Sequence, residues 1–293
     1  MSSFLVVSLN PTFQQIMGYD SVRTGQVNRT SRARSEFSGK GLNVARTLAR
    51  LGNSAVLLTH MNPSRIEELK NQAAAEGFRV LPVEDSSPIR TCVTVLQNGA
   101  RGAGVTTTEL VQESPAIEGK DTEAAVLSAF NEAVASVDCV IITGTRSPGY
   151  SRDLYPRMAA LAKKAGCRVI LDVKKNDLTG SLALEPASLP DVVKPNLEEL
   201  IQTYGASTDP LSLVEGIPCC AVITNGTKGC FIHQPGQELV HLDALRVKAR
   251  NTTGCGDAFT AAMADSLMRG ATLVEACQAG TRAGALKAQE EPF

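Results

Sequence analysis

The chain has 293 residues, of which 43% are hydrophobic, and it can therefore bury a large core as one big domain or two smaller ones. Its formal net charge is −1 and it has no basic tract, which argues against binding to nucleic acid or to an anionic membrane. No apolar run approaches the length of a membrane span, and the first residues favour a β-strand over a signal peptide.

Short apolar runs alternate with longer amphipathic segments along the whole chain. Valine- and isoleucine-rich runs separated by helices indicate a parallel sheet that helices cover on both faces. We find no internal repeat, no low-complexity linker and no domain boundary, and therefore expect one domain over residues 1–293. The predicted strands are 4–9, 55–59, 79–83, 137–142, 169–173, 192–193 and 220–224, and the predicted helices are 42–51, 66–76, 123–135, 152–165, 197–204 and 272–288.

Two segments break this alternation. Residues 12–37 are polar with isolated apolar positions and no helical pattern, whereas residues 90–111 alternate between apolar and polar positions. The second segment predicts antiparallel strands set apart from the main sheet. One interpretation is an irregular edge excursion. The other is a small β-lid, formed by about residues 12–37 and 90–111, that excludes water from a reactive phosphoryl group.

Eight cysteines are scattered along the sequence, several of them in apolar segments, as at Cys139 and Cys167. Free, buried thiols in a reducing cytosol explain this pattern better than disulfides do, so we expect a cytoplasmic protein. Neither the adjacent Cys219 and Cys220 nor the three histidines have the spacing of a zinc site.

The most informative motif is a glycine-flanked turn near the C-terminus that leads into a helix. The backbone amides of Gly254, Cys255 and Gly256 lie where a helix leaves its first N–H groups unpaired, which is an anion-binding position. Asp257 stands beside them, within reach of a hydroxyl that attacks phosphorus. The alternative is an ordinary loop in which Asp257 only stabilises its own helix.

A second glycine-rich motif opens the predicted helix at residue 42. Gly39, Lys40, Gly41 and Asn43 form a cradle suited to an anion or to hydroxyl groups. The motif is not a Walker P-loop, because the required glycine spacing is absent. By itself it is equally consistent with an ordinary loop–helix junction.

Together the two motifs resemble the signatures of the pfkB carbohydrate kinases, the ribokinase-like family, and in particular the branch of tagatose-6-phosphate kinase and 1-phosphofructokinase. The resemblance covers nearly the whole chain and implies a ribokinase-like α/β fold of three layers, α/β/α, with a mainly parallel central sheet and a small β-lid. Further segments that match in order are Leu9–Pro11, Arg90, 107–115, 143–149, Lys194–Leu200 and Thr224–Gly229.

The resemblance also implies roles for individual residues. Asp257 would be the general base, and the amides of Gly254, Cys255 and Gly256 would stabilise the transferring phosphoryl group. Lys40 and Arg90 would bind the phosphate already on the substrate. Asn196 and Glu199 would position Mg²⁺ through its waters, although spacing alone equally allows Glu199 to lie on a solvated helix face. Sugar hydroxyls would meet Gln14, Gly39, Gly41, Asn43 and Thr145, and ATP would meet Lys194, Asn196, Thr224, Gly226, Lys228 and Gly229.

Three of the positions that depart from the family pattern bear on the chemistry of the site. Gln14 stands where the branch has an aspartate that holds sugar hydroxyls, and Arg146 adds a charge near the expected sugar site. Cys255 replaces an alanine. The helix N-terminus and the anion site beside it would lower the pKa of its thiol and make it reactive, or else the thiol turns inward and is inert.

These observations favour an ATP-dependent kinase that uses Mg²⁺ and converts a ketohexose monophosphate, such as tagatose-6-phosphate or fructose-1-phosphate, into a bisphosphate. A kinase of an unphosphorylated sugar or nucleoside is a second possibility, although Lys40 and Arg90 would then have no substrate phosphate to bind. A third is a non-catalytic regulator that binds sugar phosphates on the same scaffold. The resemblance also implies a possible homodimer that pairs through the lid.

Overall fold

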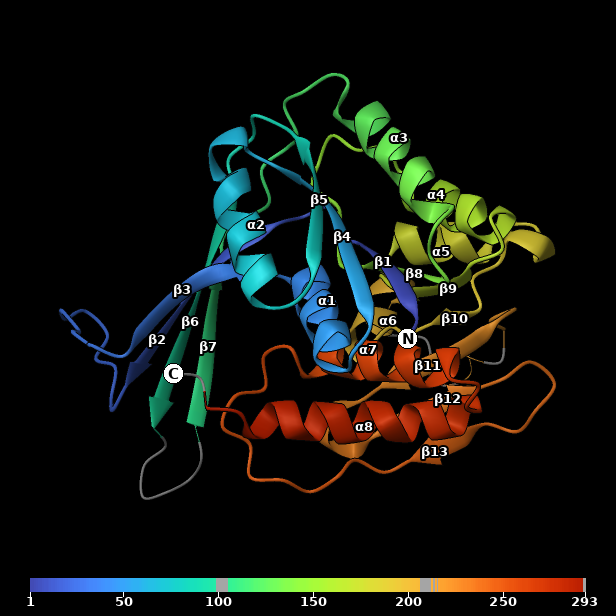
Figure 1. The fold of residues 1–293 in the computed structure, drawn as a ribbon. Coiled ribbons are helices and arrows are strands. Elements are labelled where there is room, and N and C mark those ends of the chain that lie inside the picture. The colour runs from blue at the N-terminus through green and yellow to red at the C-terminus, as the bar shows by residue number, and fades with distance from the viewer. Residues whose placement is uncertain (99–104, 206–211, 213, 215, 292–293) are drawn as a thin grey trace.

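The central layer of the protein is a nine-stranded sheet in the computed structural model, which describes residues 1–98, 105–205, 212, 214 and 216–291 (Figure 1). Its strand order is β13-β12-β11-β10-β9-β8-β1-β4-β5. Neighbouring strands from β11 to β5 are parallel, whereas β12 and β13 form an antiparallel hairpin at one edge. The strands are β1 (Ser3–Val7), β4 (Ser54–Met61), β5 (Arg79–Glu84), β8 (Cys139–Thr143), β9 (Arg168–Asp172), β10 (Val192–Val193), β11 (Cys220–Thr224), β12 (Cys230–His233) and β13 (Val240–Leu242).

Helices cover both faces of this sheet, and the alternation of β1 shows how the two faces are built. Phe4 and Val6 point into the core shared with α1, α2, α7 and α8, whereas Leu5 and Val7 point into the core shared with α3, α4, α5 and α6. All four side chains are fully buried. The helices are α1 (Lys40–Arg50), α2 (Ile66–Ala75), α3 (Thr122–Val134), α4 (Leu154–Lys164), α5 (Asn176–Leu182), α6 (Leu197–Tyr204), α7 (Cys255–Met268) and α8 (Leu273–Gln289), with 3₁₀ turns η1 (Pro63–Arg65), η3 (Pro186–Ser188) and η4 (Gly226–Lys228).

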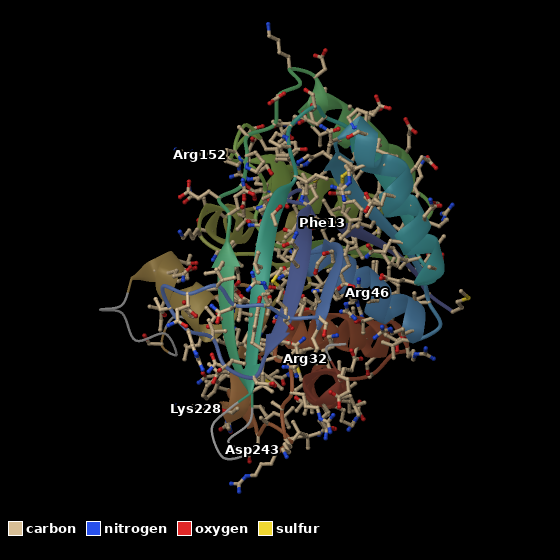
Figure 2. The ribbon with its side chains drawn as sticks, turned by 90° about the vertical axis from the view of Figure 1, so that its left-hand side faces the viewer. Phe13, Arg32, Arg46, Arg152, Lys228 and Asp243 are labelled. Atoms are coloured by element: carbon tan, nitrogen blue, oxygen red, sulfur yellow. The ribbon has the colours of Figure 1, made fainter. Side chains whose placement is uncertain are left out.

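Four strands of the described chain form a second, smaller sheet that projects from one side of the central layer (Figures 1 and 2). Its order is β3-β2-β6-β7, built from β2 (Thr12–Tyr19), β3 (Ala33–Ser38), β6 (Arg90–Asn98) and β7 (Val105–Val111). Strands β6 and β7 are antiparallel, as the alternating pattern predicted, but β2 and β6 are parallel. The two segments that break the sequence pattern therefore meet in one sheet.

The three-layer α/β/α prediction is confirmed, and each predicted strand and helix corresponds to an observed element, although the ends of most are shifted. Helix α5 escaped prediction because it has only seven residues and contains Gly180, so it shows little periodicity. All eight cysteines are free thiols, as expected. Among the described residues, no helix combines the length and the apolar character needed to cross a membrane.

Candidate active site

A cleft of about 750 Å³ is bordered by many of the predicted residues and lies between the small sheet and the ends of the central strands. Parallel α/β sheets bind ligands in this place, outside the carboxyl ends of their strands. Strands β2, β6 and β7 line one side, and the first turns of α1, α6 and α7 line the other. The predicted site residues in its lining are Gln14, Gly39, Lys40, Asn43, Arg90, Lys194, Asn196, Glu199, Thr224, Gly254, Gly256 and Asp257.

Gly254 caps the N-terminus of α7 in the left-handed region, with φ of 81°. An added Cβ there would lie 3.3 Å from Asn43 Nδ2. Glycine therefore permits both this backbone conformation and the close approach of the Asn43 side chain. The Cys255 amide donates to Thr252 O at 3.3 Å within the turn. The Gly256 amide belongs to the first turn of α7, where an intrahelical acceptor is not available, and Gly256 faces the cleft.

Asp257 lies in that same first turn and is buried, with 7% of its surface exposed. Its Oδ2 accepts a hydrogen bond from Asn43 Nδ2 at 2.8 Å, which joins α7 to α1. Burial raises the pKa of Asp257 to about 6, and nearby Asp172 acts in the same direction, whereas Lys40, the Asn43 amide and Lys194 oppose the rise. A carboxylate with this pKa can accept a proton near neutral pH.

Lys40 and Lys194 hold Asp172 between them at the end of β9. Lys40 Nζ lies 3.0 Å from Asp172 Oδ1, and Lys194 Nζ lies 3.2 Å from Asp172 Oδ2. Although burial favours the neutral acid, Lys194 and Lys40 keep the pKa of Asp172 below its ordinary value. Lys40 also pairs with Glu199 Oε1 at 2.9 Å. The cleft therefore contains a compact cluster of two ammonium groups and three carboxylates, counting Asp257.

Asn196 and Glu199 form a capping box at the start of α6. Asn196 Oδ1 accepts from the Glu199 amide at 2.7 Å, and Glu199 Oε2 accepts from the Asn196 amide at 3.0 Å. Glu199 is 8% exposed and faces the cleft, so the solvated-face interpretation is wrong. The sequence signal was present, because Asn followed three residues later by Glu is a capping pattern.

Mg²⁺ prefers oxygen ligands and keeps several of its waters, and Asn196 and Glu199 supply side-chain oxygens. Among the described residues, no group of three or more His, Cys, Asp or Glu side chains could hold a metal ion. The oxygens of Asn196 and Glu199 each have a partner, yet each keeps a further lone pair for a water molecule. These residues fit a hydrated Mg²⁺ that arrives with nucleotide phosphates, and they do not form a complete protein cage.

A smaller cavity of about 180 Å³ adjoins the cleft and shares Lys40 and Arg90 with it. Arg90 Nε donates to Thr12 Oγ1 at 2.8 Å, and no carboxylate in the described chain pairs with this guanidinium. Asn10 donates to Thr145 Oγ1 at 2.9 Å, while Asn10 Oδ1 is a buried acceptor without a partner among the described residues. The cavity thus offers one uncompensated cation and one acceptor for a hydroxyl group.

Comparison with known proteins decides the family. The pfkB family carbohydrate kinase model matches residues 6–291. The chain belongs to the pfkB carbohydrate kinase family. It is similar to tagatose-6-phosphate kinase of Staphylococcus epidermidis, at 25% identity over 98% of this chain and 92% of the relative. This chain is therefore a sugar kinase.

Two solved structures share the fold of this kinase. A possible 1-phosphofructokinase from Thermotoga maritima superimposes with a TM-score of 0.87 at 19% identity, covering 99% of this chain and 93% of that chain. A tetrameric inhibited form of phosphofructokinase-2 from Escherichia coli superimposes with a TM-score of 0.81 at 23% identity, covering 98% and 94%. These likenesses support the three-layer fold with its second, smaller sheet.

Two sets of predicted ligand residues lie outside the kinase's cleft. Gly41 is buried against β1, and an added Cβ would collide with the Ser8 side chain, so this glycine permits packing of α1 and does not face substrate. Gly229, with φ of 86°, brings the backbone against Leu242 O of β13, which makes it a tight structural turn. Gly226 and Lys228 are exposed and line neither cavity. Of this segment, only Thr224 borders the cleft.

Two departures from the family pattern have different consequences than expected. Arg146 does not border either cavity, because its Nε pairs with Asp177 Oδ1 at 2.8 Å and its Nη1 donates to Tyr150 O at 3.0 Å. The expected extra charge in the sugar site is thus absent. Burial raises the pKa of the Cys255 thiol to about 11, against the opposing effect of Lys287. A raised pKa leaves little thiolate, which favours the inert interpretation over the reactive-thiol hypothesis.

Sequence reasoning missed Asp172, although a signal existed. It is the single carboxylate at the end of an apolar strand in a parallel sheet, and such positions face the ligand crevice. It also assigned no role to Thr252, Thr253, Thr107 and Glu109, which line the cleft as well. Thr253 Oγ1 donates to Glu109 Oε1 at 3.2 Å, which links the turn before α7 to β7 of the small sheet.

Proposed function

We propose that this sugar kinase transfers the γ-phosphoryl group of ATP to a hydroxyl of a ketohexose monophosphate of the tagatose-6-phosphate or fructose-1-phosphate type, giving a bisphosphate. The observation that carries the proposal is the place of Asp257. It is a buried carboxylate at the N-terminus of α7, with a pKa raised to about 6, in a cleft that also presents Arg90.

Asp257 is the general base of the proposed reaction. It takes the proton from the attacking hydroxyl as the new oxygen–phosphorus bond forms and the bond to the bridging oxygen of ADP breaks. A well-placed base of this kind contributes about 10²–10⁴-fold to the rate. The amides of Gly254 and Gly256 lie at the positive end of α7, where they would stabilise charge on the transferring group, whereas the Cys255 amide between them is bonded to Thr252 O within the turn.

Arg90 is the main candidate for binding the phosphate already present on the substrate. It borders both cavities, and a guanidinium can give a phosphate two parallel hydrogen bonds. Lys40 borders both cavities as well, but Asp172 and Glu199 already compensate its charge. The hydroxyl-binding set near these cations is Gln14, Gly39, Asn43 and Thr145.

Asn196 and Glu199 would hold Mg²⁺ through its waters, and Lys194 and Thr224 would border the nucleotide. When bound, the metal ion supplies positive charge that offsets the charge of the phosphates in the transition state. The protein's own part is to present oxygen acceptors at the start of α6 in a fixed orientation, which the capping box does.

One observation favours a second candidate, the phosphorylation of an unphosphorylated sugar. Because Lys40 is compensated by two carboxylates, only Arg90 remains as an uncompensated cation for a substrate phosphate within the described cleft. The relative named tagatose-6-phosphate kinase supports the phosphorylated substrate.

The deciding experiment is a coupled ADP-release screen with ATP and Mg²⁺ over matched pairs, each a hexose and its monophosphate. We expect turnover with at least one ketohexose monophosphate and a kcat/KM at least about tenfold lower for the matching hexose, because one charge-assisted contact is worth about this much. Equal values within each pair would favour the second candidate.

We further propose that a second copy of the chain covers the outer edge of the small sheet. Leu110 and Val111 on the edge strand β7 are 59% and 58% exposed, which is unusual for large apolar side chains on an edge strand. Sedimentation should then show a dimer that Leu110→Lys dissociates, whereas a monomeric wild-type protein would contradict this part of the proposal.

A further inference from the structure

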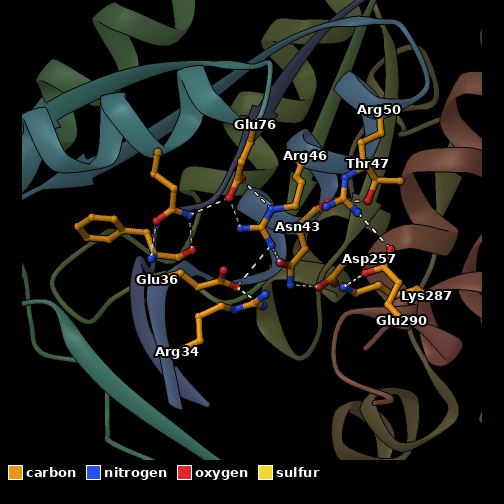
Figure 3. Close-up of polar contacts among 12 residues, drawn as sticks. Arg34, Glu36, Asn43, Arg46, Thr47, Arg50, Glu76, Asp257, Lys287 and Glu290 are labelled. Carbon is orange, nitrogen blue, oxygen red and sulfur yellow. Dashed lines mark hydrogen bonds and ion pairs between the residues drawn. The ribbon is translucent and has the colours of Figure 1, made fainter. Parts of the chain in front are cut away.

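A chain of polar contacts runs from helix α2 through α1 to Asp257 (Figure 3). Glu76 receives two hydrogen bonds from Arg46, at 2.7 Å from Nε and 2.9 Å from Nη2. Arg46 Nη1 donates to Asn43 Oδ1 at 3.1 Å, and Asn43 Nδ2 donates to Asp257 Oδ2 at 2.8 Å. Arg46 and Asn43 are one turn apart on α1, so the helix itself brings them together.

Chemistry fixes the orientation of the Asn43 amide between these two partners. Arginine has only N–H donors, so Asn43 must present its oxygen to Arg46 and its NH₂ group to Asp257. A rotated amide would place N–H against N–H on one side and oxygen against a carboxylate oxygen on the other. Both contacts would be lost together, which gives the amide one stable orientation.

Arg46 is in turn held firmly. It is 8% exposed, although arginine is rarely buried without partners. Gln72 ties Glu76 to the small sheet, because its Nε2 lies 3.2 Å from Glu76 Oε1 and 2.8 Å from Phe37 O of β3. Glu36 of the same strand lies 3.7 Å from Arg46 Nη1. The guanidinium is therefore set by contacts from three different elements.

We infer that Arg46 is a positioning residue for the base: because it can donate only to the oxygen of the Asn43 amide, it directs the N–H of that amide onto Asp257 and so fixes the carboxylate in its working orientation. Arg46 touches neither cavity and has no direct contact with Asp257. This inference rests on the proposed role of Asp257 as general base.

The contacts from Arg46 through Asn43 to Asp257 form a relay. Several charged groups act on Asp257 besides this relay. Lys40 on α1 and Lys194 after β10 favour its ionised form, whereas Asp172 on β9 and burial oppose it. The hydrogen bond from Asn43 also favours the ionised form. If Arg46 is removed, the Asn43 amide is free to rotate, and the carboxylate loses part of this bond. The pKa of Asp257 should then rise.

The direct test is a ¹³C NMR titration of aspartate carboxyls, with the Asp257 signal assigned by its loss in Asp257→Asn. Arg46→Met should raise the pKa of Asp257 by about half a unit or more, since a charge-assisted hydrogen bond supports a shift of this order. In an Asn43→Ala background the same substitution should give almost no further shift, because the relay is already broken. A direct effect of the Arg46 charge would instead give the same shift in both backgrounds, and that result would overturn the inference.

Arg50→Met is the matched control. Arg50 lies one turn further along α1 and is exposed, and its partner is Glu290 at 3.2 Å. The Arg50→Met substitution should leave the pKa of Asp257 unchanged. In turnover, Arg46→Met should lower kcat about 10- to 100-fold with little change in the KM for ATP, and should move the acid limb of the pH profile upward. Unchanged kcat and acid limb in folded Arg46→Met would also overturn the inference.

If loss of the buried guanidinium unfolds Arg46→Met, the same measurements are made on Arg46→Lys. Lysine keeps the charge and a donor, so it should restore part of kcat and give a smaller upward shift in the pKa of Asp257. No shift in a folded Arg46→Lys with wild-type kcat would count against the relay. The titration requires no substrate, so it stays informative even if the ADP-release screen finds no sugar phosphate.

Discussion

Lys40 Nζ lies 2.9 Å from Glu199 Oε1, although 159 residues separate the two in the sequence. Burial alone would lower the pKa of Lys40, but Asp172, Glu199 and Asp257 together raise it above its ordinary range. Two ammonium groups and three carboxylates share this part of the cleft, which leaves an excess of negative charge. Phosphate groups would be repelled there without an added cation.

The first prediction concerns that cation. Turnover should stop when a chelator removes divalent ions and should return with Mg²⁺. Glu199→Gln should raise the Mg²⁺ concentration needed for half-maximal rate by about tenfold or more, because an amide attracts the hydrated ion less than a carboxylate does. Glu198→Gln is the control, since Glu198 is exposed on the same helix. A titration of rate against Mg²⁺ that is the same for both variants would contradict the assignment of Glu199.

The second prediction concerns Arg90. Arg90→Ala should raise the KM for the sugar phosphate by about 10- to 100-fold and leave the KM for ATP nearly unchanged, because a charge-assisted contact to phosphate is lost. Arg32→Ala serves as the control, since Arg32 is exposed beside the same small sheet and pairs with Asp20 (Figure 2). Steady-state kinetics with both substrates varied would separate the two effects. An equal rise in both KM values would show that Arg90 does not specifically bind the phosphate of the sugar substrate.

The third prediction concerns Cys255. Because burial raises the pKa of its thiol to about 11, little thiolate is present at neutral pH. Iodoacetamide at pH 7.5 should therefore label Cys255 more slowly than free glutathione, and Cys255→Ala should keep full activity, since the thiol has no part in the proposed reaction. Mass-mapped labelling over time measures the rate. Rapid labelling of Cys255 that ATP slows would restore the reactive-thiol interpretation.

The sequence predicted the parts of this site that are continuous along the chain. The turn from Gly254 to Asp257 was found because its glycines and its carboxylate are adjacent, and Asn43 was found for the same reason. The pairing of Lys40 with Asp172 and Glu199 was not predictable, because it depends on how separate strands and helices meet. Only the folded chain brings these groups together.

Several residues that the sequence placed at or near the site lie outside the cleft for a common physical reason. Gly41 and Gly229 were assigned to ligands because their motifs resemble those of the family, but in this structure the protein itself packs closely against both glycines. Arg146 was expected to add a charge near the sugar site because it departs from the family pattern, yet it forms an ion pair with Asp177 of helix α5, which was not predicted. The residue type indicates which interactions a position allows, whereas the neighbouring residues in the fold determine which of these interactions form.

The fourth prediction links Asp257 to stability. Its pKa is about 6 in the folded protein against an ordinary value of 3.8, so the folded state holds a proton more strongly than the unfolded state does. The stability that this proton provides is present below pH 4 and is lost as the pH rises through 6. Asp257→Asn should therefore have a higher Tm than the wild type at pH 7.5, and the difference should shrink toward pH 4. Equal Tm values at pH 7.5 would contradict the raised pKa.

The most direct test of the central claim is the turnover of Asp257→Asn on the best sugar phosphate from the ADP-release screen, with ATP affinity measured alongside. Asparagine keeps the shape of the side chain and can accept the hydrogen bond from Asn43, but it cannot take up the proton of the attacking hydroxyl. We expect kcat to fall by at least about 10²-fold while the Kd for ATP changes little. Wild-type kcat in this variant would show that Asp257 is not the base.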